Sequence, residues 1–264
     1  MGYISDRITW KRETETGKFL DGEIWIGQLD SSSFAAIASE HSDVLVTCYI
    51  DKEHLSSLAR MDNKTEDEIL NNILPDKPHI RSGDFGEILS RSVLQEWKDS
   101  PKFPTERWRN RSTKNDTVRG TDLVGYLCYG DKPNKDDLLV FCEVKTRENG
   151  GDKDVVKLAY DGVLNDNTTR LTNTLYLLQY ALLRDGRVDE AKKLGRFSDP
   201  YEHPYRKRLI AFIVHEERNW TNGYLQVLPD NHHLPDEFLV VIIKFGDLAK
   251  WIDRIYDMVA KVYE

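Results

Sequence analysis

The sequence has few cysteines and no long hydrophobic run, and each absence argues against a class of protein. Cys48, Cys128 and Cys142 form no CxxC pair and no cluster with histidine, which argues against a disulfide framework or a zinc site. We expect them to be reduced core residues. No apolar run approaches the length of a membrane span, and the first residues are too polar for a signal peptide. We therefore expect a cytoplasmic protein without membrane contact.

Positive charge is also in short supply, since the formal net charge is −8. This argues against a protein that simply coats nucleic acid, because such binding depends on neutralising phosphates. One basic stretch, residues 98–119, is the exception. It is either a solvated loop or a phosphate track beside a site, with Phe103 or Trp108 available to stack on bases. The candidate DNA-binding residues are Lys102, Arg107, Arg109, Arg111, Lys114 and Arg119.

The 264 residues are enough for one globular unit with a sizeable core. Apolar patterning predicts an α/β fold in which a central mixed β-sheet is flanked by helices. Residues 1–78 carry no catalytic pattern and are interpreted as an N-terminal extension that could bind a partner, followed by a core over residues 79–264. Expected strands are 43–50, 121–129, 137–146, 209–215 and 238–245; expected helices include 82–97, 154–164, 168–183 and the C-terminal segment.

The stretch LLVFCEVKT, residues 138–146, ends by placing a carboxylate and an amine two residues apart. Both faces of this strand begin apolar, which indicates burial on both sides, and Glu143 and Lys145 project to the same face. The connection GDKPNKD is rich in turn-forming residues and predicts a hairpin with residues 121–129. In that hairpin, Asp122 lies opposite residues 143–145.

Two carboxylates and a lysine at one end of a hairpin suit metal-dependent phosphodiester cleavage. Asp122, Glu143 and the backbone carbonyl of Val144 offer the hard oxygen ligands that Mg²⁺ prefers, while Lys145 orients the nucleophile. Simpler structural interpretations remain: a solvated strand end for Glu143 and Lys145, and a turn residue for Asp122. Glu87 is either a further metal ligand or the partner of Asp84 in a helix-capping box.

The blocks GDFGE (83–87), GTD (120–122) and FCEVKT (141–146) together resemble the PD-(D/E)xK nuclease superfamily. Their order and the chain length are similar to the HamA family, the effector nucleases of Hachiman anti-phage defence. The resemblance implies a restriction-endonuclease-like core in which Asp122, Glu143 and Glu87 bind Mg²⁺, with Mn²⁺ able to substitute. It also implies that Lys145 is catalytic and that a HamB-like helicase subunit restrains the nuclease until phage DNA or DNA damage is sensed.

Some members of the superfamily carry a Gln followed four residues later by Tyr on the helix after the core strands. Here Gln179 is followed at that spacing by Leu183, with Tyr180 adjacent. Two other functions are compatible with the pattern. One is a non-catalytic subunit that docks on a helicase or on DNA, and the other is a sequence-specific restriction-like endonuclease.

Overall fold

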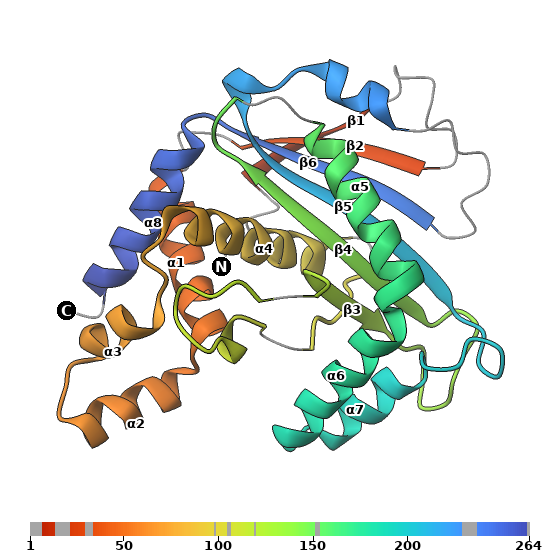
Figure 1. The fold of residues 1–264 in the computed structure, drawn as a ribbon, viewed down its shortest axis with the longest axis horizontal. Helices are drawn as coiled ribbons and strands as arrows, with labels where there is room; N and C mark the ends of the chain where they lie inside the picture. Colours follow the sequence, from red (N-terminus) through yellow and green to blue (C-terminus); the bar gives the residue numbers. More distant parts are fainter. Residues whose placement is uncertain are drawn as a thin grey trace.

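The computed structural model describes residues 7–13, 22–29, 34–97, 99–104, 107–118, 120–150, 154–228 and 237–262. Within these ranges six strands form one sheet in the order β1-β2-β6-β5-β4-β3 (Figure 1). The strands are β1 (Ile8–Glu13), β2 (Gly22–Leu29), β3 (Leu123–Leu127), β4 (Leu138–Arg147), β5 (Arg206–Glu216) and β6 (Glu237–Phe245). The inner four are mutually parallel, while β1 and β3 pair antiparallel at the two edges. The predicted mixed sheet is confirmed.

Helices cover both faces of the sheet, so the predicted α/β arrangement is confirmed as well. One face is covered by α1, α4 and α8, and the other by α5, beside which α6 and α7 pack on each other (Figure 1). The helices are α1 (Phe34–Tyr49), α2 (Lys52–Asp62), α3 (Glu66–Ile73), α4 (Pro78–Glu96), α5 (Val155–Asn165), α6 (Leu171–Arg184), α7 (Val188–Gly195) and α8 (Leu248–Val262). Among the described helices, none combines the length and apolar content needed to cross a membrane.

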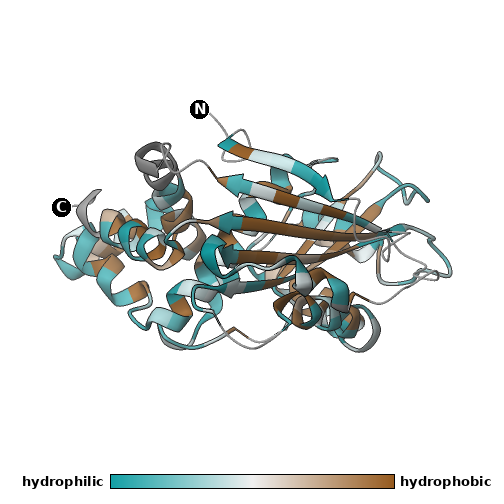
Figure 2. Ribbon diagram, turned by 90° about the horizontal axis from the view of Figure 1, so that it is seen from above, coloured by the Kyte–Doolittle hydropathy of each residue, from teal (hydrophilic) through white to brown (hydrophobic). Residues whose placement is uncertain are grey.

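The central strands are apolar along most of their length because both of their faces are covered (Figure 2). Along β4, Val140 and Cys142 pack in the cluster under α4, whereas Leu139 and Phe141 pack in the cluster under α5. This alternation sends the side chains of Glu143 and Lys145 toward the α5 face. None of the three cysteines forms a disulfide; Cys48 and Cys142 are buried, and Cys128 is half-buried.

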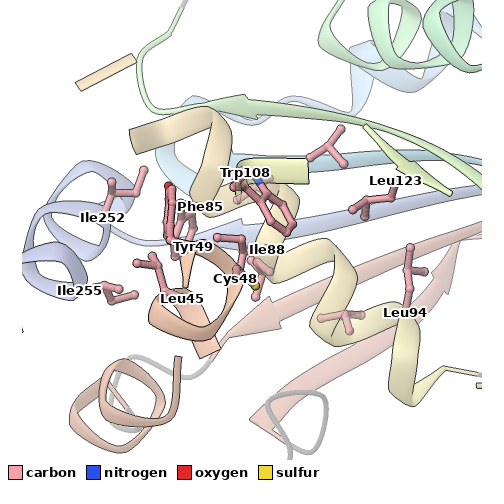
Figure 3. Close-up of a cluster of buried hydrophobic side chains, with 14 of the residues drawn as sticks. Leu45, Cys48, Tyr49, Phe85, Ile88, Leu94, Trp108, Leu123, Ile252 and Ile255 are labelled. Carbon is pink, nitrogen blue, oxygen red and sulfur yellow. The ribbon is translucent and has the colours of Figure 1, made fainter. Parts of the chain in front are cut away.

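The strand expected at residues 43–50 is wrong, because residues 43–49 form the second half of helix α1. Leu45, Cys48 and Tyr49 lie on the helix face that packs toward α4 and α8 (Figure 3). Its run of apolar and β-branched residues suits a buried helix as well as a buried strand, and tertiary packing decides between them.

The first 78 residues contribute directly to the sheet and to the core. β2 pairs in parallel with β6, and α1 packs against α8, so elements from the first 50 and the last 30 residues lie side by side. The catalytic pattern lies at the opposite edge, on β3 and β4. One half of the sheet, β1, β2 and β6, is therefore built from the two terminal parts of the chain. The other half, β5, β4 and β3, is built from its middle.

Candidate active site

The β3–β4 hairpin brings Asp122 beside Glu143, as the sequence predicts. Leu123 pairs with Cys142, so Asp122, one residue before β3, falls next to Glu143. The peptide N–H of Val144 donates to Asp122 Oδ2 over 2.9 Å, which orients the carboxylate. In the connection, the Asp137 side chain accepts from the peptide N–H of Tyr129 at 2.6 Å and thereby fixes the turn. Ligation by the Val144 carbonyl stays a prediction.

Glu143 and Lys145 form an ion pair in a partly closed position. Lys145 Nζ donates to Glu143 Oε1, and the Glu143 side chain is only 13% exposed, so a freely solvated strand end does not describe it. Helix α5 passes directly over this carboxylate. A Cβ on Gly162 would lie 2.7 Å from Glu143 Cγ, closer than two carbons can approach. Glycine at this position is what lets Glu143 occupy its place.

Glu87 faces the same cluster from helix α4. The expected capping box is wrong, because α4 begins at Pro78 and Asp84 lies inside the helix. Proline suits the first turn, where its missing N–H has no helical partner. Glu87 Oε2 lies 3.7 Å from Arg107 Nε, and its side chain is 16% exposed. The structure therefore leaves Glu87 as a carboxylate of the site and not as a cap.

Arg107, expected on an exposed phosphate track, lies among these carboxylates. Its Nη1 donates to Asp122 Oδ1 at 2.8 Å and to the Thr121 carbonyl at 2.9 Å, and its Nη2 donates to the Val118 carbonyl. Its side chain is 13% exposed. The guanidinium is thus the positive group closest to Asp122 that the structure describes.

A second buried ion pair lies one helical turn before Glu87. Asp84, 3% exposed, accepts from Arg111 and from the Tyr49 hydroxyl, and Tyr49 lies 3.1 Å from the Tyr256 hydroxyl. This network joins α1, α4, α8 and the loop after Trp108. No periodicity in the sequence marks it, because its members come from four distant segments.

The rest of the basic stretch is also engaged in intramolecular contacts. Arg109 forms two hydrogen bonds to Asp51, at 2.7 and 2.9 Å, and Lys114 pairs with Asp76 at 2.8 Å. Lys102 is exposed and its backbone bridges to Tyr126, while Arg119 lies outside the described residues. Contact of these residues with DNA stays a prediction. Base stacking by Phe103 or Trp108 is wrong, because both rings are buried in the core.

The site carries more negative charge than its own cations offset. Burial, opposed by Arg107, raises the pKa of Glu87 to about 8, with Asp122 adding to the rise. Burial and Asp122 likewise raise the pKa of Glu143 to about 7. Carboxylates that resist ionisation in this way gain from a divalent cation, so the donor set fits Mg²⁺ or Mn²⁺. Within the described ranges, no three His, Cys, Asp or Glu side chains already converge as a metal site.

Sequence reasoning missed Asp166, a carboxylate close to this cluster. It lies in a π-helical turn, η4 (Asp166–Arg170), between α5 and α6, is fully buried, and pairs with Arg170 at 3.0 Å. Its charge contributes to the raised pKa of Glu143. The sequence feature that could have indicated Asp166 is the polar segment DNTTR, which interrupts two helical patterns. Gln179 bonds instead to the Ala191 carbonyl of α7, at 3.3 Å.

Two comparisons with known proteins bear on this site. The model of the HamA family matches residues 10–259, which includes every strand from β2 to β6 and all of the carboxylates described above. No curated protein matches the chain.

Proposed function

The chain belongs to the HamA family, which is associated with anti-phage defence, and we propose that it is a divalent-metal-dependent DNA nuclease with a restriction-endonuclease-like core. One observation carries the proposal: Asp122, Glu143 and Lys145 meet at the ends of two paired strands. Two carboxylates and an amine at one point supply the charges that phosphodiester hydrolysis requires.

Asp122 and Glu143 are the proposed ligands of Mg²⁺, with Glu87 from α4 and the Val144 carbonyl completing the set. Mn²⁺ is expected to substitute because it accepts the same oxygen ligands. When bound, the metal lowers the pKa of a water molecule and offsets negative charge on the phosphate. The Val144 N–H holds one oxygen of Asp122, so the aspartate is oriented before any cation arrives.

Lys145 carries the positive charge that acts on the substrate directly. Its side chain is 31% exposed, more than that of Glu143, so its ammonium can reach a phosphate or an attacking water. Its bond to Glu143 keeps its ammonium group in place beside the carboxylates. We assign it the orientation of the nucleophile and the stabilisation of the pentavalent transition state.

We further propose that the chain works in the cytoplasm with a HamB-like helicase subunit that restrains cleavage. The family supports this proposal, and β1 offers a partner an edge of the described sheet, at the opposite end of the strand order from β3. Plasmid cleavage measured with and without the helicase subunit tests it. Equal cleavage in both reactions would contradict restraint.

Substitution of Lys145 and Glu143 tests the nuclease assignment. We expect Lys145→Met and Glu143→Gln to reduce cleavage of linear DNA in Mg²⁺ by about a hundredfold or more, without loss of folding. The matched controls are Lys157→Met and Asp161→Asn, because these residues form an ion pair at 2.6 Å on the exposed surface of α5. Undiminished cleavage by the Glu143 and Lys145 variants would disprove the assignment.

A non-catalytic docking subunit is the second candidate function. It is favoured by the guanidinium of Arg107 on Asp122 and by the lack, among the described residues, of three converged ligands. Calorimetric titration with Mn²⁺ separates the two functions. A catalytic site binds the cation and loses it in Asp122→Asn, whereas a docking subunit gives no site that depends on Asp122.

A further inference from the structure

Arg107 lies against Asp122, the residue that would hold a divalent cation. Asp122 has two carboxylate oxygens, and both are engaged: Oδ2 accepts from the Val144 peptide, and Oδ1 accepts from Arg107 at 2.8 Å. A divalent ion close to Oδ1 would lie within a few ångströms of the guanidinium. At that separation in a site of low polarity, like charges repel strongly. The ion and Arg107 therefore compete for the same oxygen.

The backbone of Arg107 is anchored by the core, and its guanidinium is held by polar contacts. The next residue, Trp108, is 2% exposed and packs in the core near Phe85 and Ile88 (Figure 3), which anchors the 3₁₀ turn η3 (Arg107–Asn110). The guanidinium itself is bonded to one carboxylate and two backbone carbonyls. Rotation of the side chain can thus release Asp122 without moving the turn.

Glu87 lies near the Nε atom of Arg107, whereas Asp122 is bonded to its Nη1 atom. Glu87 Oε2 lies 3.7 Å from Nε, beyond a hydrogen bond but within an ion pair. Glu87, Arg107 and Val118 also line one cavity of 70 Å³. The side chain therefore has space and a charged partner outside its bond to Asp122.

We propose that Arg107 is an exchangeable counter-ion, bonded to Asp122 in the metal-free protein and released to a substrate phosphate when a divalent cation takes Asp122. The proposal rests on the metal-dependent nuclease proposed above. It makes the binding of metal and of DNA mutually reinforcing, because each favours the released guanidinium. By linkage, DNA then raises the affinity for the cation by the same factor by which the cation raises the affinity for DNA.

Cation affinity measured without DNA tests the competition directly. We expect Arg107→Gln to bind Ca²⁺ or Mn²⁺ about tenfold more tightly than the wild type by calorimetry, because no charged hydrogen bond has to break first. Arg109→Gln is a close control. Arg109 lies in the same 3₁₀ turn and also bonds to one carboxylate and two carbonyls, those of Thr47 and Cys48, but away from the site. Its cation affinity should equal that of the wild type.

A second measurement tests the release to phosphate. Ca²⁺ should tighten binding of a fluorescent DNA duplex to the wild type, and Arg107→Gln should lose most of that gain. If Arg107→Gln does not fold by circular dichroism, Arg107→Lys replaces it. Lysine keeps the charge but cannot hold Asp122 and both carbonyls together, so its cation affinity should lie above that of the wild type.

The outcomes separate this inference from the nuclease proposal. Tighter cation binding in Arg107→Gln without any DNA cleavage by the wild type would support the exchange and overturn the nuclease. Cleavage by the wild type with unchanged or weaker cation binding in Arg107→Gln would overturn the exchange and keep the nuclease. Absence of cation binding in both proteins would overturn both.

Discussion

Replacing Gly162 with alanine tests how strictly cleavage depends on the position of Glu143. An added Cβ would lie 2.7 Å from Cγ, 2.8 Å from Cδ and 2.9 Å from Oε1 of Glu143. Ordinary carbon–carbon contact begins at about 3.5 Å, so the carboxylate must move by about 0.8 Å or the helix must shift by that distance. A misplacement of about 1 Å at a reacting group costs about a hundredfold in rate.

The same substitution should leave the fold intact, so a loss of cleavage can be attributed to the displaced Glu143 carboxylate and not to unfolding. Gly162 lies inside α5, where alanine favours the helix by about 1 kcal/mol relative to glycine. That gain offsets the cost of moving one side chain that is partly exposed. We therefore expect a melting temperature equal to or above that of the wild type, together with a large loss of cleavage.

Gly83→Ala provides the matched control. Gly83 also lies inside a helix, α4, and a Cβ there would have no heavy atom within 4 Å. It should gain the same helical stability and retain the wild-type rate. The assay is single-turnover cleavage of a fluorescent DNA in Mg²⁺, with thermal melting of each variant. Cleavage by Gly162→Ala at the wild-type rate would refute the reasoning, because Glu143 would then tolerate displacement.

Two further predictions concern stability. Asp84→Asn should lower the free energy of unfolding by about 3 kcal/mol, because it leaves the guanidinium of Arg111 buried without its counter-charge; a loss below about 1 kcal/mol in urea titration would contradict this. Burial raises the pKa of Glu87 to about 8 and of Glu143 to about 7, so the folded protein holds protons that the unfolded chain has released. Without divalent cations, the free energy of unfolding should therefore fall as the pH rises from about 5 to about 8. Glu87→Gln should flatten that fall, and a wild-type stability that rises over this range would contradict it.

The β3–β4 hairpin can be predicted from the sequence because its geometry depends on residues that are close together in the chain. A connection rich in turn formers fixes the register of two adjacent strands, and the register places Asp122 beside Glu143. Burial of β4 on both faces was likewise readable from its unbroken apolar run. Both features follow from residues close together in the chain.

The position of Arg107 was not predictable, because its contacts depend on the path of a loop without periodicity. From composition, Arg107 and Arg109 are equivalent members of a basic stretch. In the structure they pair with different carboxylates, Asp122 within the site and Asp51 outside it. The misassigned strand at residues 43–50 has a related cause, since only packing against α4 and α8 distinguishes a buried helix from a buried strand.

The order of the strands also bears on how the chain folds during synthesis. β3, β4 and β5 pair with one another and come from the middle of the chain, whereas β2 and the other edge of β5 can pair only with β6, which is made almost last. Closing so long a loop is slow, and until it closes β5 presents an unpaired, apolar edge. The strands that carry Asp122, Glu143 and Lys145 can therefore pair while the other half of the sheet is still incomplete.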